Sequence, residues 1–222
     1  MADRLCFIHT VATLVPRFAE LASQHLPGVD VFHTLDESLL QDLLRHGPGT
    51  SITSRVVGHA ELAADAGATA IVFTCSSTSP AVDVARQVVD VPIIKIDDPM
   101  AHTAVLNGKI IGVLCTTSST VEPSRQLLAT HAAVAGREVE IVPHLVADAF
   151  DALRSGDRAT HDRLVSDSAA TLSGRCDLLV LAQASLAHLR DDLEAALSRT
   201  VLSSPGPLMA ELVSRFGKGD GK

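Results

Sequence analysis

The feature of this sequence that most constrains its fold is an order of strands and helices that occurs twice. Short apolar runs such as residues 4–10 and 68–74 alternate with segments whose apolar residues have helical spacing, and the same order begins again at residue 108. Strands that alternate with helices form parallel sheets joined by right-handed crossovers. The sequence therefore predicts an α/β protein with two pseudo-symmetric Rossmann-like lobes, each with a mainly parallel sheet, and an active site in the cleft between them.

The two predicted lobes meet near the segment "DDPM" at residues 97–100. We expect an N-terminal lobe over residues 1–98 and a C-terminal lobe over residues 99–206, with a last helix at 207–216 that packs on the first lobe. Asp97 or Asp98 is expected to turn the chain before Pro99, because aspartate and proline favour turns. This segment is then a linker and a candidate hinge.

Composition and charge exclude several classes of partner. The net charge is −8, there is no long basic run, and Trp and Tyr are absent, so nucleic-acid binding is not expected. No apolar segment reaches the roughly 20 residues that span a membrane, and the N-terminus does not resemble a signal peptide. The four cysteines lie far apart without metal-ligand spacing, so neither a disulfide scaffold nor a metal site is expected. We expect a cytoplasmic protein that is a homo-oligomer.

Four polar stretches follow predicted strands directly: "HT" at 9–10, "TCSSTS" at 74–79, "CTTSST" at 115–120 and "QAS" at 183–185. In open parallel sheets, ligands bind at the carboxyl ends of the strands. These stretches offer hydroxyls and backbone N–H groups but no carboxylate, which predicts a pocket for a small anion such as a carboxylate. The candidate substrate-binding residues are His9, Thr10, Thr74, Ser76, Ser77, Thr116, Thr117, Ser118, Thr120, Ala184 and Ser185.

Cys75 and Gln183 are the candidate catalytic residues, because they occupy equivalent places in the two halves. A thiolate can remove a proton from carbon or add to a double bond, and a thiol can protonate an enolate. Gln183 could donate a hydrogen bond to the oxyanion that forms. A structural interpretation remains open, because a lone cysteine after a buried strand is often a small core residue. We interpret Cys6, Cys115 and Cys176 in that way.

Histidine is the side chain that most readily exchanges protons near neutral pH. His9, at the end of the first predicted strand, is therefore the best-placed second proton carrier if the protein racemises its substrate. It could equally donate to a backbone carbonyl at the strand end. His59, His131 and His161 lie on predicted helices and are expected at the surface.

The four strand-end segments together resemble the aspartate/glutamate/hydantoin racemase superfamily, which also includes maleate isomerase and arylmalonate decarboxylase. The resemblance covers almost the whole chain. It implies two α/β lobes, no cofactor, and one cysteine from each lobe on opposite faces of the substrate carbon. Cys75 matches the first-lobe cysteine, Ser76 and Ser77 match small residues that bind a substrate carboxylate, and Ser118 lies near another such hydroxyl. Gln183 stands where the second cysteine is expected.

The glutamine argues against symmetric two-thiol racemisation, because an amide carries no proton between about pH 5 and 9. The expected function is that of a cofactor-independent isomerase or racemase of a small acid such as an amino acid, hydantoin or dicarboxylate. It would transfer a proton, or add a thiol, through Cys75 at the carbon next to a carboxylate. Two alternatives remain: a one-thiol decarboxylase of a malonate-type acid, and a non-catalytic protein that binds small carboxylates.

Overall fold

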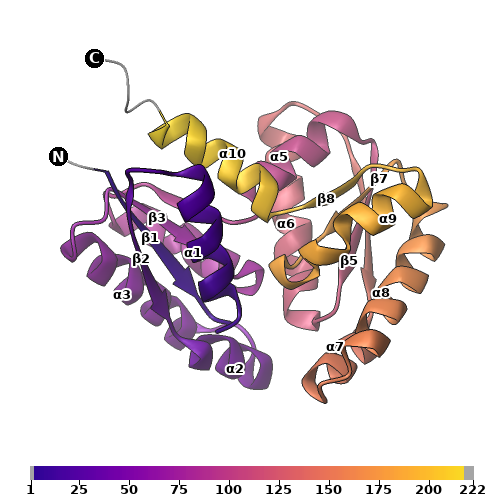
Figure 1. The fold of residues 1–222 in the computed structure, drawn as a ribbon, viewed down its shortest axis with the longest axis horizontal. Coiled ribbons are helices and arrows are strands. Elements are labelled where there is room, and N and C mark those ends of the chain that lie inside the picture. Colours follow the sequence, from indigo (N-terminus) through magenta and orange to yellow (C-terminus); the bar gives the residue numbers. More distant parts are fainter. Residues whose placement is uncertain (1–2, 218–222) are drawn as a thin grey trace. The chain divides into compact units, whose positions relative to one another are not determined.

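The computed structural model describes residues 3–217, which form two compact units. The first unit consists of the chain up to Ile96 and the segment from Gly206 onward, and the second unit is Asp97–Pro205. Each unit contains one four-stranded parallel sheet with helices around it (Figure 1). The predicted α/β fold class, with one sheet in each half of the chain, is therefore confirmed.

The sheet of the first unit has the strand order β2-β1-β3-β4, and all its pairings are parallel. Parallel neighbours need crossover connections, which the helices supply. The strands are β1 (Arg4–His9), β2 (Asp30–Leu35), β3 (Ala70–Phe73) and β4 (Ile93–Lys95). The helices are α1 (Leu14–His25), α2 (Glu37–His46), α3 (Thr50–Asp65), the short 3₁₀ helix η1 (Ser76–Thr78), α4 (Ser79–Val88) and α10 (Pro205–Phe216).

The second unit repeats this plan with the strand order β6-β5-β7-β8, again entirely parallel. The strands are β5 (Ile110–Cys115), β6 (Glu140–Leu145), β7 (Leu178–Leu181) and β8 (Val201–Ser203). The helices are α5 (Asp98–Asn107), α6 (Ser118–Val134), α7 (Ala147–Arg154), α8 (Arg158–Ser173), the 3₁₀ helix η2 (Ala184–Leu189) and α9 (Arg190–Leu197). β5 and β7 thus correspond to β1 and β3.

The central strands are mainly apolar because helices cover both faces of each sheet; in β1 only the end residues Arg4 and His9 are polar. In β1, Cys6 and Ile8 join an apolar cluster with residues of α2, α3 and α4. Phe7 points to the opposite face, where its ring lies 5.3 Å from that of Phe18 in α1. Among the apolar clusters described within residues 3–217, one takes all its residues from the first unit and two take all theirs from the second. Each unit therefore has a core of its own.

Two helices have no counterpart in the sequence prediction. The segment at 97–100, expected to be a linker turn, instead begins α5. Pro99 lies in the first turn of this helix, where a backbone N–H has no partner within the helix, so proline costs no hydrogen bond there. α7 buries only Ala149, so its apolar pattern is too weak to indicate a helix.

Within residues 3–217, no helix combines the length and the apolar character that crossing a membrane requires.

Candidate functional site

Cys75 lies at the carboxyl edge of the first sheet, beside Thr10. β1 and β3 run side by side with Ile8 opposite Phe73, and Thr10 and Cys75 each lie two residues beyond that pair. The two side chains therefore leave the sheet at neighbouring positions. Cys75 has an extended backbone (φ −114°, ψ 112°) and occupies the position just before η1, which continues into α4. The thiol thus stands at the start of a helical segment, where unpaired backbone N–H groups gather.

The thiol of Cys75 is held largely in its neutral form. The residue is half-buried, and desolvation of the sulfur raises the pKa of the Cys75 thiol above its ordinary value. The Thr10 side chain, the backbone N–H groups of Ser77 and Thr78, and the Thr78 side chain lower this pKa in part. At neutral pH the group is therefore mainly a thiol, which can give a proton. The surrounding donors stabilise the thiolate once it forms.

Thr10 contributes a buried hydroxyl that lacks a conventional hydrogen bond. The residue is 3% exposed, and its Oγ1 has no hydrogen-bond partner of normal geometry within residues 3–217. The hydroxyl nevertheless lies close enough to Cys75 to lower the pKa of its thiol. An unpaired buried polar group costs about 1–3 kcal/mol. Thr10 therefore has bonding capacity to offer to a ligand beside Cys75.

The other three cysteines are buried, as the structural interpretation expects. Burial raises the pKa of Cys6 to about 11 and that of Cys115 to about 12. Desolvation also raises the pKa of Cys176, whose Sγ lies 3.4 Å from the carbonyl oxygen of Leu172. Cys75 is therefore the one partly exposed thiol among the four.

His9 is fully buried, and both of its ring nitrogens are engaged. The Thr74 hydroxyl donates to the carbonyl oxygen of Ile8 (3.2 Å), so Nδ1–H of His9 donates to Thr74 Oγ1 (2.9 Å). Nε2 of His9 then accepts from Nδ1–H of His33 at 2.9 Å. Burial and the nearby His33 lower the pKa of His9 to about 4. The ring is therefore neutral, and neither of its nitrogens is free to bind a substrate. This geometry is that of a structural residue that positions Thr74, the neighbour of Cys75.

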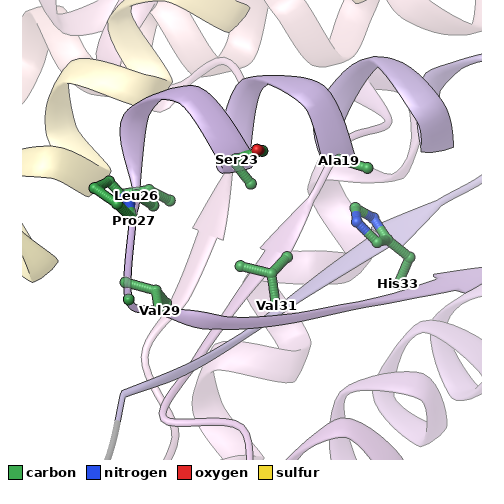
Figure 2. A pocket seen from close by; sticks show the side chains of 9 residues that line it. Ala19, Ser23, Leu26, Pro27, Val29, Val31 and His33 are labelled. Atoms are coloured by element: carbon green, nitrogen blue, oxygen red, sulfur yellow. The ribbon is translucent and has the colours of Figure 1, made fainter.

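A pocket of about 450 Å³ lies between α1 and β2 of the first unit, and Figure 2 shows the His33 ring extending from β2 toward this helix. Its lining is mainly aliphatic and contains none of the predicted site residues; it consists of Ala19, Ala22, Ser23, Leu26, Pro27, Gly28, Val29, Val31 and His33. His33, which lines the pocket, is bonded to His9 at the end of β1. We therefore do not place the chemistry there.

Gln183 occupies in the second unit the position that Cys75 has in the first. Leu114 of β5 lies opposite Leu181 of β7, and Thr116 and Gln183 each follow two residues later. Gln183 also has an extended backbone (φ −142°, ψ 134°) just before a 3₁₀ helix, η2. The predicted equivalence of the two positions agrees with this topology.

The carboxamide of Gln183 has a fixed orientation. Its Oε1 accepts from the backbone N–H of Thr116 (2.6 Å) and from the Thr116 hydroxyl (2.9 Å). A backbone N–H can only donate, so the oxygen, and not the nitrogen, faces Thr116. The two N–H groups of Nε2 have no partner in the described part of the chain. Gln183 is therefore a pre-oriented hydrogen-bond donor.

The remaining predicted residues of the second unit lie at the starts of α6 and η2. Thr117 precedes α6, and its hydroxyl lies 2.8 Å from that of Thr120; both residues are buried. Ser118, the first residue of α6, is exposed. In η2, Ala184 is buried and Ser185 is exposed. The Thr117 and Thr120 hydroxyls thus bond to each other at the start of α6, whereas Ser118 and Ser185 are open to solvent.

Comparison with known proteins supplies the relationship that this geometry suggests. The model of the Asp/Glu/hydantoin racemase family matches residues 8–211, which is nearly the whole chain. The chain belongs to this family. A search of curated proteins finds no match.

Solved structures of racemases resemble this family member over almost its full length. Glutamate racemase isoform RacE1 from Bacillus anthracis superimposes with a TM-score of 0.76 at 18% identity, covering 98% of this chain and 83% of that one. Aspartate racemase from Picrophilus torridus superimposes with a TM-score of 0.73 at 14% identity, covering 97% of this chain and 95% of that one. Arylmalonate decarboxylase superimposes with a TM-score of 0.59 at 17% identity, covering 100% of this chain and 95% of that one. At such identities these likenesses show a common fold, and that fold accommodates more than one reaction.

Sequence reasoning about this racemase-family chain missed a cluster around Asp162. His161, expected at the surface, is 1% exposed, so that prediction is wrong. His161 shares a face of α8 with buried Val165 and Ala169, and this spacing of four residues was a signal in the sequence. Its Nδ1 lies 2.7 Å from Asp162 Oδ1, and Nε2 of His188 lies 2.9 Å from the same oxygen. Residues 3–217 hold no set of three or more side chains arranged to bind a metal ion, so this cluster is a hydrogen-bond network.

Proposed function

We propose that this racemase-family protein transfers a proton through Cys75 at the carbon next to the carboxylate of a small acid. One observation carries the proposal: a half-buried thiol at a helix start, beside the buried hydroxyl of Thr10, which has no conventional hydrogen bond and lies close enough to lower the pKa of the thiol. A thiol held only as a core residue needs neither partial exposure nor such a hydroxyl beside it. The family match supports the reaction class.

The chemistry follows from the two protonation states of Cys75. As a thiolate it removes the proton from the substrate carbon, and the electron pair of the broken C–H bond enters an enediolate on the carboxylate. Return of a proton from the thiol to carbon completes an isomerisation or an exchange. We assign binding of the carboxylate to Thr10 and to the segment of Ser76 and Ser77, and oxyanion stabilisation to the N–H groups of Gln183. A well-placed donor contributes roughly 3–4 kcal/mol to such a step.

A second candidate is a one-thiol decarboxylase, which the resting protonation of Cys75 favours. In this reaction the bond between carbon and one carboxylate breaks, carbon dioxide leaves, and the enediolate takes its proton from the neutral thiol. Water then reprotonates the thiolate. Desolvation keeps Cys75 in the required thiol form at neutral pH. Gln183, which carries no transferable proton, stands at the position where a second thiol would otherwise be needed.

Proton NMR in heavy water tests the proposal directly. Aspartate, glutamate, hydantoins, maleate and arylmalonates are incubated with the protein, and the signal of the proton next to the carboxylate is followed. We expect its exchange for deuterium, a cis-trans conversion, or loss of the second carboxylate with deuterium delivered to one face. Cys75→Ala should abolish the reaction, whereas Cys176→Ala, which alters a buried thiol, should retain it. Full turnover by Cys75→Ala would overturn the proposal, and binding without any turnover would indicate a carboxylate-binding protein.

A further inference from the structure

His188 makes two hydrogen bonds that require both of its ring nitrogens to be donors. Its Nδ1 lies 3.0 Å from the carbonyl oxygen of Ser185, and its Nε2 lies 2.9 Å from Oδ1 of Asp162. A carbonyl oxygen only accepts. Hydrogen bonds from His161 and His188 outweigh the effect of burial and lower the pKa of Asp162, so its carboxylate also only accepts. The geometry therefore corresponds to the doubly protonated imidazolium form of His188.

The positive charge belongs to His188 and not to His161. Nδ1–H of His161 donates to Asp162, and its Nε2 is buried with no partner within residues 3–217. A charged His161 would bury an unpaired N–H, which costs more than burying a neutral nitrogen without a partner. The two rings are nearly parallel, with centroids 6.4 Å apart, so two positive charges would also repel each other.

The bond from His188 ends on the turn that begins at Gln183. The backbone N–H of Leu186 donates to the carbonyl oxygen of Gln183 (3.0 Å), which closes this turn around Ser185. The turn is thus held by Thr116 at the side chain of Gln183 and by His188 at the carbonyl of Ser185.

We propose that His188 is a positioning residue for Gln183: as an imidazolium it fastens the turn at 183–186 to Asp162 of α8. The proposal rests on the donor role assigned to Gln183 in the proposed function. A neutral His188 has one N–H and can keep only one of its two bonds.

The charges around His188 come from α8 and α9. Asp162, His161 and Arg158 belong to α8, and the Arg158 guanidinium lies 3.8 Å from the second oxygen of Asp162. In α9, Arg190 is paired with Asp191 (2.6 Å) and Glu194 (2.6 Å). Asp162 is therefore the anion that His188 contacts directly.

The protonation state is tested by NMR of the full chain with ¹⁵N-labelled histidine. We expect two ring N–H signals from His188, because both protons are held in hydrogen bonds and exchange slowly with water. Exposed His46 is the internal reference and should give neither signal. Asp162→Asn should remove the Nε2–H signal of His188. A His188 ring with one bare nitrogen, or with signals unchanged by Asp162→Asn, would overturn the proposal.

The positioning role is tested at Gln183 itself, without a substrate. His188→Gln should shift the side-chain amide signals of Gln183 and increase their mobility, while His102→Gln, a change at an exposed histidine of the same unit, should leave them unchanged. With a substrate, His188→Gln should lower turnover about tenfold or more, because small displacements of catalytic groups are costly. In a protein that already carries Gln183→Leu, His188→Gln should cause no further loss of turnover.

These outcomes separate the two proposals. If Cys75→Ala keeps full turnover, the proposed function fails, but the Gln183 amide signals still decide whether His188 positions that side chain. Unchanged Gln183 signals in His188→Gln, or a full further loss of turnover in the double variant, would overturn the role of His188.

Discussion

At the scale of single residues, the two units place different side chains at equivalent positions, a thiol in the first unit and an amide in the second. Cys75 and Gln183 both follow a central strand, and each lies beside a threonine from the neighbouring strand, Thr10 or Thr116. In the second unit the threonine satisfies the amide oxygen, whereas in the first unit the Thr10 hydroxyl is left without a conventional partner. The proton-bearing group and the open hydroxyl therefore belong to one unit, and the fixed donor belongs to the other.

Gln183→Glu tests the donor role with little disturbance of structure. A glutamate oxygen can still accept from Thr116, but the N–H donors of Nε2 are replaced by a second oxygen with negative charge. We expect turnover to fall about 100-fold or more, because a negative charge then faces the developing oxyanion. The unfolding free energy should stay close to that of the original protein. Steady-state kinetics measure the turnover, and urea unfolding measures the free energy of unfolding. Retained turnover would show that Gln183 has no donor role.

Alkylation by iodoacetamide tests the accessibility of Cys75. We expect this thiol to be modified first, because the other three are buried. The reaction should be slow at neutral pH and accelerate as pH rises, since burial raises the pKa of Cys75 and only the thiolate reacts. Peptide mass spectrometry identifies the site, and Cys75→Ala should leave the folded protein unmodified. Faster modification of Cys6 or Cys115 would contradict the burial of those thiols.

At the scale of elements, the sequence predicts what depends on local pattern. The strands are recognisable because buried parallel strands are continuous apolar runs, and β3 and β7 are buried at every residue. The candidate positions follow from the strand ends in the same way. The pairings of His33 with His9 and of His188 with Asp162 join residues 24 and 26 positions apart. Such contacts depend on which helices and strands lie together, so no local pattern indicates them.

The burial of His9, together with its neighbour His33, makes the stability of the first unit sensitive to acid. The pKa of His9 is about 4 in the folded chain and about 6.5 when unfolded, so the unfolded chain binds more protons between these values. His9 therefore stabilises the fold fully above about pH 6.5, and this contribution, about 3 kcal/mol, is lost as pH falls to about 4. His9→Gln can keep both hydrogen bonds but cannot titrate.

We expect the unfolding free energy of His9→Gln to change less than that of the original protein between about pH 7 and about pH 4.5, as measured with urea. His46→Gln alters an exposed histidine and should follow the original pH dependence. An equal loss of stability in His9→Gln and in the original protein would mean that His9 is not the buried neutral group.

At the scale of the whole molecule, the chain passes between the two units twice, at Ile96 and at Pro205. The second unit is therefore one continuous segment, whereas the first is assembled from both ends of the chain. α10, which follows the second passage, contributes buried Leu208, Met209 and Leu212. A core made from its own residues allows a domain to fold alone. This condition is met by a fragment of the second unit, whereas a fragment of residues 1–96 keeps its apolar cluster but lacks the part of its unit that α10 supplies.

We therefore predict that a fragment of residues 97–205 folds by itself, because the two apolar clusters described for this unit lie entirely within it. It should show a helical circular dichroism spectrum and one cooperative urea transition, with an unfolding free energy of about 5 kcal/mol or more. A fragment of residues 1–96 is the comparison and should be less stable than the first unit in the full chain, since it keeps its apolar cluster but lacks the buried residues of α10. Addition of a peptide with the α10 sequence should raise its stability. A disordered 97–205 fragment would show that the core of the second unit depends on the rest of the chain.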